Sequence, residues 1–226
     1  MSDKASIREQ IIALRDAAVP ERRRAWSRVI CECATQLPQY IAAKCIHCFL
    51  SMRSEIDTQY LIQHALLNGK QVAIPHFVRN REETPSLQIS TLNEDAFAVS
   101  GFGLRVPRMK QRIEPEEIDL VFVPLLAFKQ NSILRRIEDQ ARTSIIDEAN
   151  KHANATAVER ASKMIFHRVG YGAGYYDRFL TRIRPGVGRV GLAFGLQQVH
   201  DFAVEAHDVP LDLVISEVCV NAGHPF

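Results

Sequence analysis

The segment Asp119-Leu-Val-Phe-Val-Pro-Leu-Leu-Ala-Phe128 contains the clearest strand in this sequence. Its nearly continuous apolar character is typical of a central strand in a parallel sheet, because helices cover both faces of such a strand. We therefore expect an α/β fold that is organised around this strand.

A strand–helix–strand unit lies upstream and predicts parallel strands. Its first strand ends at residues 49–52, Asp57 or Thr58 caps a helix that stops at Gly69, and an apolar strand follows over residues 70–75. Two strands joined by a helix in this way run parallel and are connected by a right-handed crossover.

The remaining chain continues to alternate strands with helices. Further strands are expected at residues 87–92, 188–194 and 212–216, and helices at residues 3–18 and after Pro20. In the first helix Ile7, Ile11 and Leu14 recur at helical spacing and predict the buried face. No internal repeat or low-complexity linker divides the sequence, so we expect one α/β domain over residues 1–226.

Residues 129–169 interrupt this alternation. Apolar residues recur at helical spacing from Ile133 to Ile145, and Thr156-Ala-Val-Glu159 has the form of a capping box. We expect a helical insertion between the central strand and the glycine-rich segment that follows it.

The composition is that of a soluble globular protein with a sizeable core. Of 226 residues 46% are hydrophobic and 24% charged, and 28 basic against 26 acidic residues leave a net charge of +2. This charge is too small to indicate nucleic-acid binding, and Arg22 to Arg24 are a weak signal on their own. No targeting signal or apolar run of about 18 residues is present, so we expect a cytoplasmic protein without a membrane partner.

Five cysteines are present, an odd number that argues against a disulfide scaffold. Cys45-Ile-His-Cys48 resembles a metal or redox motif, but it lies in a strand-like run. Residues three apart on a strand point to opposite faces, so buried thiols are the favoured interpretation.

The glycine-rich segment is Arg168-Val-Gly-Tyr-Gly-Ala-Gly-Tyr-Tyr-Asp-Arg-Phe-Leu180. Glycine allows a positive φ and brings the backbone close to a ligand. Successive amides in such a loop form an anion-binding concavity, and Asp177 follows within reach of a metal ion carried by a phosphate. Two interpretations remain open at this point, a phosphate site and an ordinary glycine turn covered by aromatic side chains.

Two other places bear candidate ligand-binding groups. Lys4 and Arg8 are four residues apart and share a helix face, either as a solvated basic face or as a phosphate clamp. Leu50, Met52 and Glu55 follow the first strand of the strand–helix–strand unit. In open α/β sheets ligands bind beyond the carboxyl ends of the strands, which makes this a candidate functional edge.

Several segments together resemble the 5-formyltetrahydrofolate cyclo-ligase family, also called methenyltetrahydrofolate synthetases. They are Lys4-x-x-x-Arg8, Phe49-Leu-Ser-Met-x-x-Glu55-Ile, Asp119-Leu-Val-Phe-Val-Pro, Arg168-Val-Gly-Tyr-Gly-Ala-Gly-Tyr-Tyr-Asp177-Arg, Gly191-Leu-Ala-Phe and His207-Asp-Val-Pro-Leu-Asp212. They occur in one order and span nearly the whole chain apart from the insertion. The resemblance implies a three-layer α/β/α sandwich with a mostly parallel sheet.

The resemblance also implies roles for residues that match the family motifs. Lys4 and Arg8 resemble the cations that meet the phosphates of ATP. The nucleotide loop matches Arg168, Gly170, Gly172, Ala173, Gly174, Tyr175 and Tyr176. Folate contacts match Leu50, Glu55, Gly172, Gly174 and Tyr175. Arg168 and Tyr175 are the expected catalytic residues, with no proton transfer assigned to Tyr175, and Asp177 and Asp212 resemble magnesium ligands.

The implied activity is the ATP- and Mg²⁺-dependent conversion of 5-formyltetrahydrofolate, possibly polyglutamylated, to 5,10-methenyltetrahydrofolate with release of ADP and phosphate. A monomer or weak homodimer is expected. The alternatives are a folate-binding or regulatory paralogue with impaired catalysis, and an unrelated nucleotide- or sugar-phosphate-binding α/β enzyme.

The sequence departs from the family pattern in two places. Lys129 stands where the family has an aspartate, and Val106-Pro107-Arg108-Met109 replaces a Pro-x-Pro element. The insertion at 129–169 is a lid, a partner surface or a tolerated insertion, of which we favour the last because loop closure entropy grows slowly with length.

Overall fold

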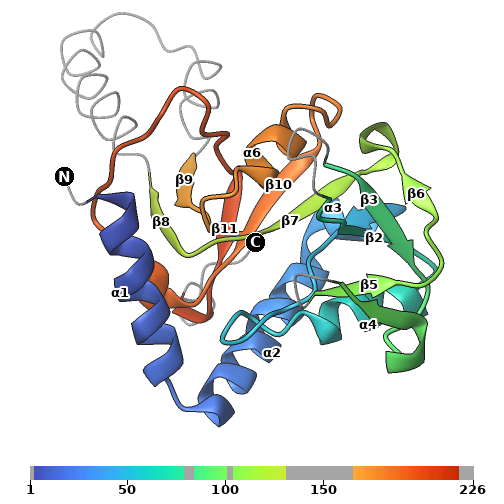
Figure 1. Cartoon of the computed structure of the whole chain (residues 1–226), viewed down its shortest axis with the longest axis horizontal. Helices are drawn as coiled ribbons and strands as arrows, with labels where there is room; N and C mark the ends of the chain where they lie inside the picture. The colour runs from blue at the N-terminus through green and yellow to red at the C-terminus, as the bar shows by residue number, and fades with distance from the viewer. Residues whose placement is uncertain (1–2, 79–83, 101–103, 131–164, 219–226) are drawn as a thin grey trace, which may run out of the picture.

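A seven-stranded sheet forms the centre of the protein, as the computed structural model in Figure 1 shows. The structure describes residues 3–78, 84–100, 104–130 and 165–218. The order of the strands across the sheet is β11 (Leu213–Ile215), β10 (Gly188–Leu192), β7 (Leu120–Pro124), β1 (Cys45–His47), β2 (Gln71–Pro75), β3 (Ser86–Ile89) and β6 (Arg112–Ile113). The first five are parallel to one another, and the pairs β2–β3 and β3–β6 are antiparallel.

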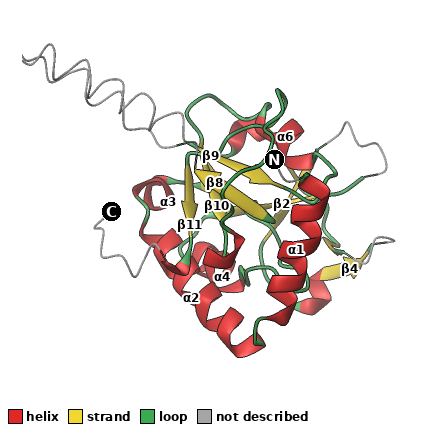
Figure 2. Cartoon of the chain, turned by 90° about the vertical axis from the view of Figure 1, so that its left-hand side faces the viewer, coloured by secondary structure: helices red, strands yellow, loops and turns green. Residues whose placement is uncertain are grey.

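Helices cover both faces of this sheet. Within the described residues the α-helices are α1 (Lys4–Ala17), α2 (Pro20–Gln36), α3 (Pro38–Ala42), α4 (Gln59–Leu67) and α6 (Tyr175–Leu180). Figure 2 shows α2 and α4 on one side of the sheet and α6 on the other. Along β7, Phe122 belongs to the cluster that contains α2 and α4, whereas Val121 and Val123 belong to the cluster that contains α6. The expected three-layer α/β/α sandwich with a mostly parallel sheet is confirmed.

The first helix differs from its predicted face. Ile7 and Ile11 are buried as expected, but Leu14 is 52% exposed and Arg15 is only 3% exposed. The two isoleucines pack against Ala127, next to the segment that leads into the glycine-rich loop. Because α1 lies over this segment instead of over the middle of the sheet, its buried arc includes a basic residue.

The predicted strand at residues 119–128 is two strands. After β7 the chain breaks at Leu125 and Leu126 and continues as β8 (Ala127–Gln130), which pairs in the antiparallel direction with β9 (Phe166–Val169). Both ends of the expected helical insertion at 129–169 are therefore strand, and residues 131–164 lie outside the described part of the chain. A second antiparallel pair joins β4 (Phe97–Val99) to β5 (Arg105–Pro107).

The cysteine prediction is confirmed for the residues that the structure describes. Cys31, Cys45 and Cys48 are buried and free, and Cys33 is half-buried and free, while Cys219 lies outside the described residues. Within the described ranges, none of the helices has the length and apolar character that a membrane span requires.

Candidate active site

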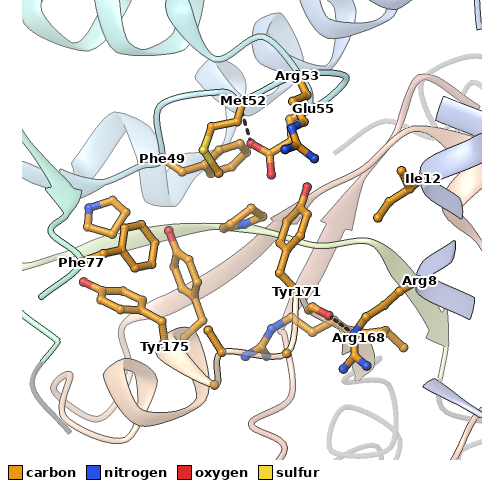
Figure 3. Close-up of a pocket in the computed structure, with 18 of the residues that line it drawn as sticks. Arg8, Ile12, Phe49, Met52, Arg53, Glu55, Phe77, Arg168, Tyr171 and Tyr175 are labelled. Carbon is orange, nitrogen blue, oxygen red and sulfur yellow. Dashed lines mark hydrogen bonds between the residues drawn. The ribbon is translucent and has the colours of Figure 1, made fainter. Parts of the chain in front are cut away.

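A cavity of about 1070 Å³ opens at the carboxyl edge of the parallel strands. Leu50 follows β1, Pro75 ends β2 and Pro124 ends β7, and all three line this cavity. The opposite wall consists of α1 and of the loop between β9 and α6, which Figure 3 shows facing the turn after β1. The cavity therefore occupies the position in which open α/β sheets bind their ligands.

The glycine-rich loop has the left-handed backbone that its sequence predicts at two of its three glycines. Gly172 has a φ of 95° and Gly174 a φ of 64°, values that only glycine adopts without strain. The carbonyl of Gly170 accepts a hydrogen bond from Arg8 Nε at 2.8 Å. A Cβ at Gly172 would lie 3.6 Å from the guanidinium carbon of Arg8, so the loop and α1 are in close contact. Ala173 also lines the cavity.

Lys4 faces the same cavity and is held by two acids from the segment before β11. Its Nζ lies 2.8 Å from Asp208 Oδ2 and 3.5 Å from Glu205 Oε2. Burial opposes ionisation of Asp208, but the backbone N–H of Glu205 and the Lys4 ammonium prevail and lower its pKa. Asp208 is therefore an anion that fixes Lys4 at the wall of the cavity. His207, with these two acids, completes a group whose ligand atoms lie within 4.8 Å of one another.

Arg168 and Asp177 form a largely buried pair beneath the glycine loop. Arg168 donates from Nη2 to Asp177 Oδ1 at 2.6 Å and from Nη1 to the carbonyl of Val209. Burial lowers the pKa of Arg168, and the charge of Asp177 opposes this effect. Asp177 Oδ1 also accepts from the N–H of Val209 at 3.2 Å. The Asp177 side chain remains 24% exposed and lines the cavity.

The structure does not bring Asp212 to the cavity. Asp212 is absent from the lining, and its two carboxylate oxygens accept from Arg189 Nε and Nη2, each at 3.0 Å. The backbone N–H of Arg189 donates to the same carboxylate at 2.9 Å. Asp212 therefore joins β10 to the start of β11, and its expected role as a second metal ligand stays a prediction without support from this geometry.

The two tyrosines of the nucleotide-loop motif use their hydroxyl groups differently. Tyr175 is buried and donates to the carbonyl of Pro85 at 2.9 Å, with its ring 4.9 Å from that of Phe77. Burial raises the pKa of Tyr175. The ring of Tyr176 packs against His47 and Phe179, and its buried hydroxyl has no partner among the described residues. Both residues line the cavity, but the Tyr175 hydroxyl is occupied by Pro85 and the Tyr176 hydroxyl is buried.

A tight turn after β1 places Glu55 at the cavity. The N–H of Glu55 donates to the carbonyl of Met52 at 3.0 Å, and the N–H of Met52 donates to Glu55 Oε2 at 2.9 Å. Between them Arg53 has a positive φ of 52°. Burial raises the pKa of Glu55, and Tyr171, the Met52 N–H and Arg15 act in the opposite direction. Leu50 also lines the cavity, as its position after the strand predicts.

Three residues of the site carried no predicted role. Arg15 follows Arg8 by seven residues, or two helical turns, so its spacing placed it on the face of Lys4 and Arg8. Tyr171 lies within the segment from Arg168 to Tyr176 that resembles the nucleotide loop, but no separate role is predicted for its side chain. Asp208 lies in the motif near the end of the chain, but its pairing with Lys4 spans 204 residues, and no local pattern predicts such a contact.

Fold and cavity together define an α/β protein with a ligand site at the carboxyl edge of its sheet. The model of the 5-formyltetrahydrofolate cyclo-ligase family matches residues 1–133 and 140–217. The chain belongs to this family, which is a family of ligase enzymes.

Individual relatives agree with this membership. The 5-formyltetrahydrofolate cyclo-ligase of Haemophilus influenzae is 26% identical over 221 residues, which cover 92% of this chain and 94% of that protein. The enzyme of the same name from Mus musculus is 22% identical, with 96% and 94% covered. The solved structure of a 5,10-methenyltetrahydrofolate synthetase from Mycoplasma pneumoniae has a TM-score of 0.67 at 19% identity and covers 96% of this chain and 99% of that chain, a likeness of fold.

Proposed function

We propose that this chain converts 5-formyltetrahydrofolate and ATP to 5,10-methenyltetrahydrofolate, ADP and phosphate. The γ-phosphoryl group moves to the formyl oxygen and ADP leaves. The folate N10 then forms a bond to the activated formyl carbon and loses its proton, and the carbon–oxygen bond breaks to release phosphate. Phosphoryl transfer requires positioning and charge neutralisation more than covalent chemistry from the protein, and the charged cavity is suited to that task.

The phosphates are assigned to the wall built from α1 and the glycine loop. Arg8 is directed there by its bond to Gly170, and Lys4 presents an ammonium at the same wall. Lys4 exchanges part of its contact with Asp208 for a phosphate oxygen when ATP binds. The loop amides between Gly170 and Tyr176 supply uncharged donors, because the positive φ values of Gly172 and Gly174 turn the backbone sharply at this point.

A magnesium ion bound with ATP would neutralise phosphate charge, and Asp177 is the residue that we assign to hold it. Its Oδ1 is used by Arg168 and Val209, whereas the described residues provide no partner for Oδ2 at the cavity. A single carboxylate suits Mg²⁺, which keeps several waters and takes further ligands from phosphate oxygens. Asp212 does not fit this role, since Arg189 uses its carboxylate outside the cavity.

The folate is assigned to the wall that carries Leu50 and Glu55. A buried carboxylate accepts hydrogen bonds from the donor edge of a pterin ring, and Phe49, Phe77 and Tyr175 provide apolar and aromatic surface around it. We assign Tyr175 to ring contact without proton transfer, because its hydroxyl already donates to Pro85. Arg168 orients Asp177 and thereby acts on the site from beneath the loop.

The observation that carries this proposal is the meeting of two unlike walls in one cavity, a basic wall for phosphates and an acidic, aromatic wall for a pterin. The test is turnover of purified protein with ATP, Mg²⁺ and 5-formyltetrahydrofolate, followed by the absorbance of the methenyl product. We expect product formation that requires all three additions. Folded protein that binds 5-formyltetrahydrofolate without consuming ATP would instead identify a folate-binding paralogue with impaired catalysis.

A further inference from the structure

Tyr171 lies between the two walls of the cavity. It belongs to the glycine loop, flanked by Gly170 and Gly172, and Figure 3 shows its side chain rising from that loop toward Glu55. Its hydroxyl accepts a hydrogen bond from Arg15 Nη2 at 3.0 Å, while 45% of the residue remains exposed. The hydroxyl of Tyr171 is held by Arg15 while much of the residue is exposed. Tyr171 is therefore in a position to contact ligands at both walls of the cavity.

Arg15 is the buried anchor of this tyrosine. It is 3% exposed, and within the described part of the chain no group accepts from its Nε. A buried guanidinium is destabilising unless its donors are paired. Loss of the bond to Tyr171 would leave a further donor of Arg15 unpaired, so this bond is expected to persist. Lys4, Arg8 and Arg15 lie on one face of α1, because separations of four, seven and eleven residues bring side chains back to nearly the same angle. The helix that presents the phosphate-binding cations therefore also holds Tyr171.

Glu55 is the acidic neighbour of the same hydroxyl. Tyr171 and Arg15 both act on its carboxylate and partly offset the effect of burial on its pKa. Arg15 and Glu55 also line a second, much smaller cavity beside Phe49. Three elements that are distant in the sequence thus meet at one point, which we call the Arg15–Tyr171–Glu55 link: helix α1, the glycine loop and the turn after β1.

We infer that Arg15 is a positioning residue that acts through Tyr171 to couple the nucleotide loop to the folate wall at Glu55, so that each ligand favours binding of the other. The identity of the two ligands rests on the proposed function. Phosphates on the loop amides would order the backbone on both sides of Tyr171, and a pterin at Glu55 would hold the tip of the same side chain. Once the first ligand has ordered this segment, the second ligand binds with a smaller loss of conformational entropy. The two ligands therefore favour each other's binding.

The test measures equilibrium binding of 5-formyltetrahydrofolate with and without a non-hydrolysable ATP analogue and Mg²⁺. We expect the analogue to tighten folate binding of the wild-type protein about 5- to 50-fold. The coupling ratio is the factor by which the analogue tightens folate binding. It should fall to about 2-fold or less in Tyr171→Phe, which removes only the hydroxyl, and in Arg15→Lys, which replaces the planar guanidinium by an ammonium. In both variants the KM for each substrate rises most when the other substrate is scarce.

Tyr40→Phe is the matched control. Tyr40 is a buried tyrosine whose hydroxyl bonds to His64 Nδ1 at 2.7 Å outside the cavity, so its loss affects stability and leaves the coupling ratio unchanged. A wild-type ratio near 1, or an unchanged ratio in Tyr171→Phe, overturns the inference even if turnover is normal. Failure of the wild-type protein to bind either ligand overturns the proposed function and the link with it. Because the Tyr171 ring is half exposed, Tyr171→Phe decides the question even if Arg15→Lys fails to fold.

Discussion

Two arginine–aspartate pairs in this protein differ in how many oxygens of the aspartate the arginine and the backbone use. Arg168–Asp177 lies under the glycine loop, and one Asp177 oxygen accepts both from Arg168 and from the backbone of Val209. Arg189–Asp212 lies at the start of β11, and both Asp212 oxygens are used by Arg189. Asp177 lines the cavity and its hydrogen bonds to the described residues use only Oδ1, whereas Asp212 lies outside the cavity lining and uses both oxygens to join two strands.

The same contrast recurs for other residue types. Gly172 and Gly69 both have positive φ, but only Gly172 lines the cavity. Lys4 and Lys129 each bind an aspartate and have side chains that are 14% exposed, but only Lys4 lines the cavity. The comparison teaches that location relative to the cavity, and not residue type, separates a group that can act on a ligand from one that supports the fold. Each pair supplies a variant and its matched control.

The largest effect is expected for Asp177→Asn. The substitution keeps the shape of the side chain and removes the charge assigned to the metal, so kcat should fall by about 100- to 1000-fold and the Mg²⁺ requirement should rise. Steady-state turnover across a Mg²⁺ titration measures both quantities.

Asp212→Asn is the control for that experiment. It loses charge-assisted bonds to Arg189, so we expect a decrease of about 1–2 kcal/mol in the free energy of unfolding and an unchanged Mg²⁺ requirement. A raised Mg²⁺ requirement in Asp212→Asn would restore the two-carboxylate metal site that the sequence motifs imply, and would end the distinction drawn between the pairs.

The next effect is expected for Lys4→Met, which should raise the KM for ATP about 10- to 100-fold because it removes a charge-assisted contact with the phosphates. Lys129→Met is the control. Lys129 donates to Asp201 Oδ1 at 2.5 Å and to the carbonyl of Phe202 at 2.6 Å, so its loss should lower stability and leave the KM for ATP unchanged. Equal KM values for the two variants would remove Lys4 from the phosphate site.

Gly172→Val should weaken ATP binding at least about 10-fold in a protein that remains folded. At a φ of 95° a branched side chain is strained, and its Cβ would lie 3.6 Å from the Arg8 guanidinium. Gly69→Val is the control, because Gly69 has a φ of 71° and a Cβ built there would meet no atom within 4 Å. We expect it to lower the free energy of unfolding by about 1–2 kcal/mol and to leave the affinity for ATP unchanged. Calorimetric titration with ATP and thermal unfolding distinguish the two effects, and unchanged ATP affinity in Gly172→Val would leave the loop a structural role only.

The smallest effect is a pH dependence of folate binding. Burial raises the pKa of Glu55 above its usual 4.5, and the carboxylate must be ionised to accept hydrogen bonds from a pterin. Affinity for 5-formyltetrahydrofolate should therefore be full above the raised pKa and fall several-fold as the pH drops through it. The same measurement on Glu55→Gln should show weaker binding that no longer follows this titration. A wild-type profile in that variant would assign the titration to another group.

The sequence predicts the layers of this fold well because alternation of apolar strands and amphipathic helices reports burial directly. It fails at two places where burial depends on a distant partner. The run from Asp119 to Phe128 is uniformly apolar, so its pattern contains no sign that the chain leaves the sheet at Leu125 to pair with β9. On α1, Leu14 and Arg15 are adjacent on the helix, and the position of the glycine loop decides that the arginine is the one buried.

The candidate site follows the same rule. Glycine spacing predicts the positive φ at Gly172 and Gly174, which is a local backbone property. Asp177 and Asp212 are equivalent as sequence motifs, because no motif reports how many carboxylate oxygens an arginine already uses. The contacts from Arg15 to Tyr171 and from Lys4 to Asp208 depend on the complete fold, and this is why neither was predicted.

The order in which the chain is synthesised gives the contacts of α1 a further significance. Lys4, Arg8 and Arg15 reach partners that are 204, 162 and 156 residues away. On a ribosome the helix α1 emerges long before β9, α6 and the segment around Asp208, so its basic face has no native partner during most of translation. The nucleotide wall can form only after the glycine loop has left the exit tunnel, and contacts of such long range form slowly. On the proposed function, a ribosome-bound chain stalled before residue 165 should therefore not retain ATP, because the glycine loop has not yet been synthesised.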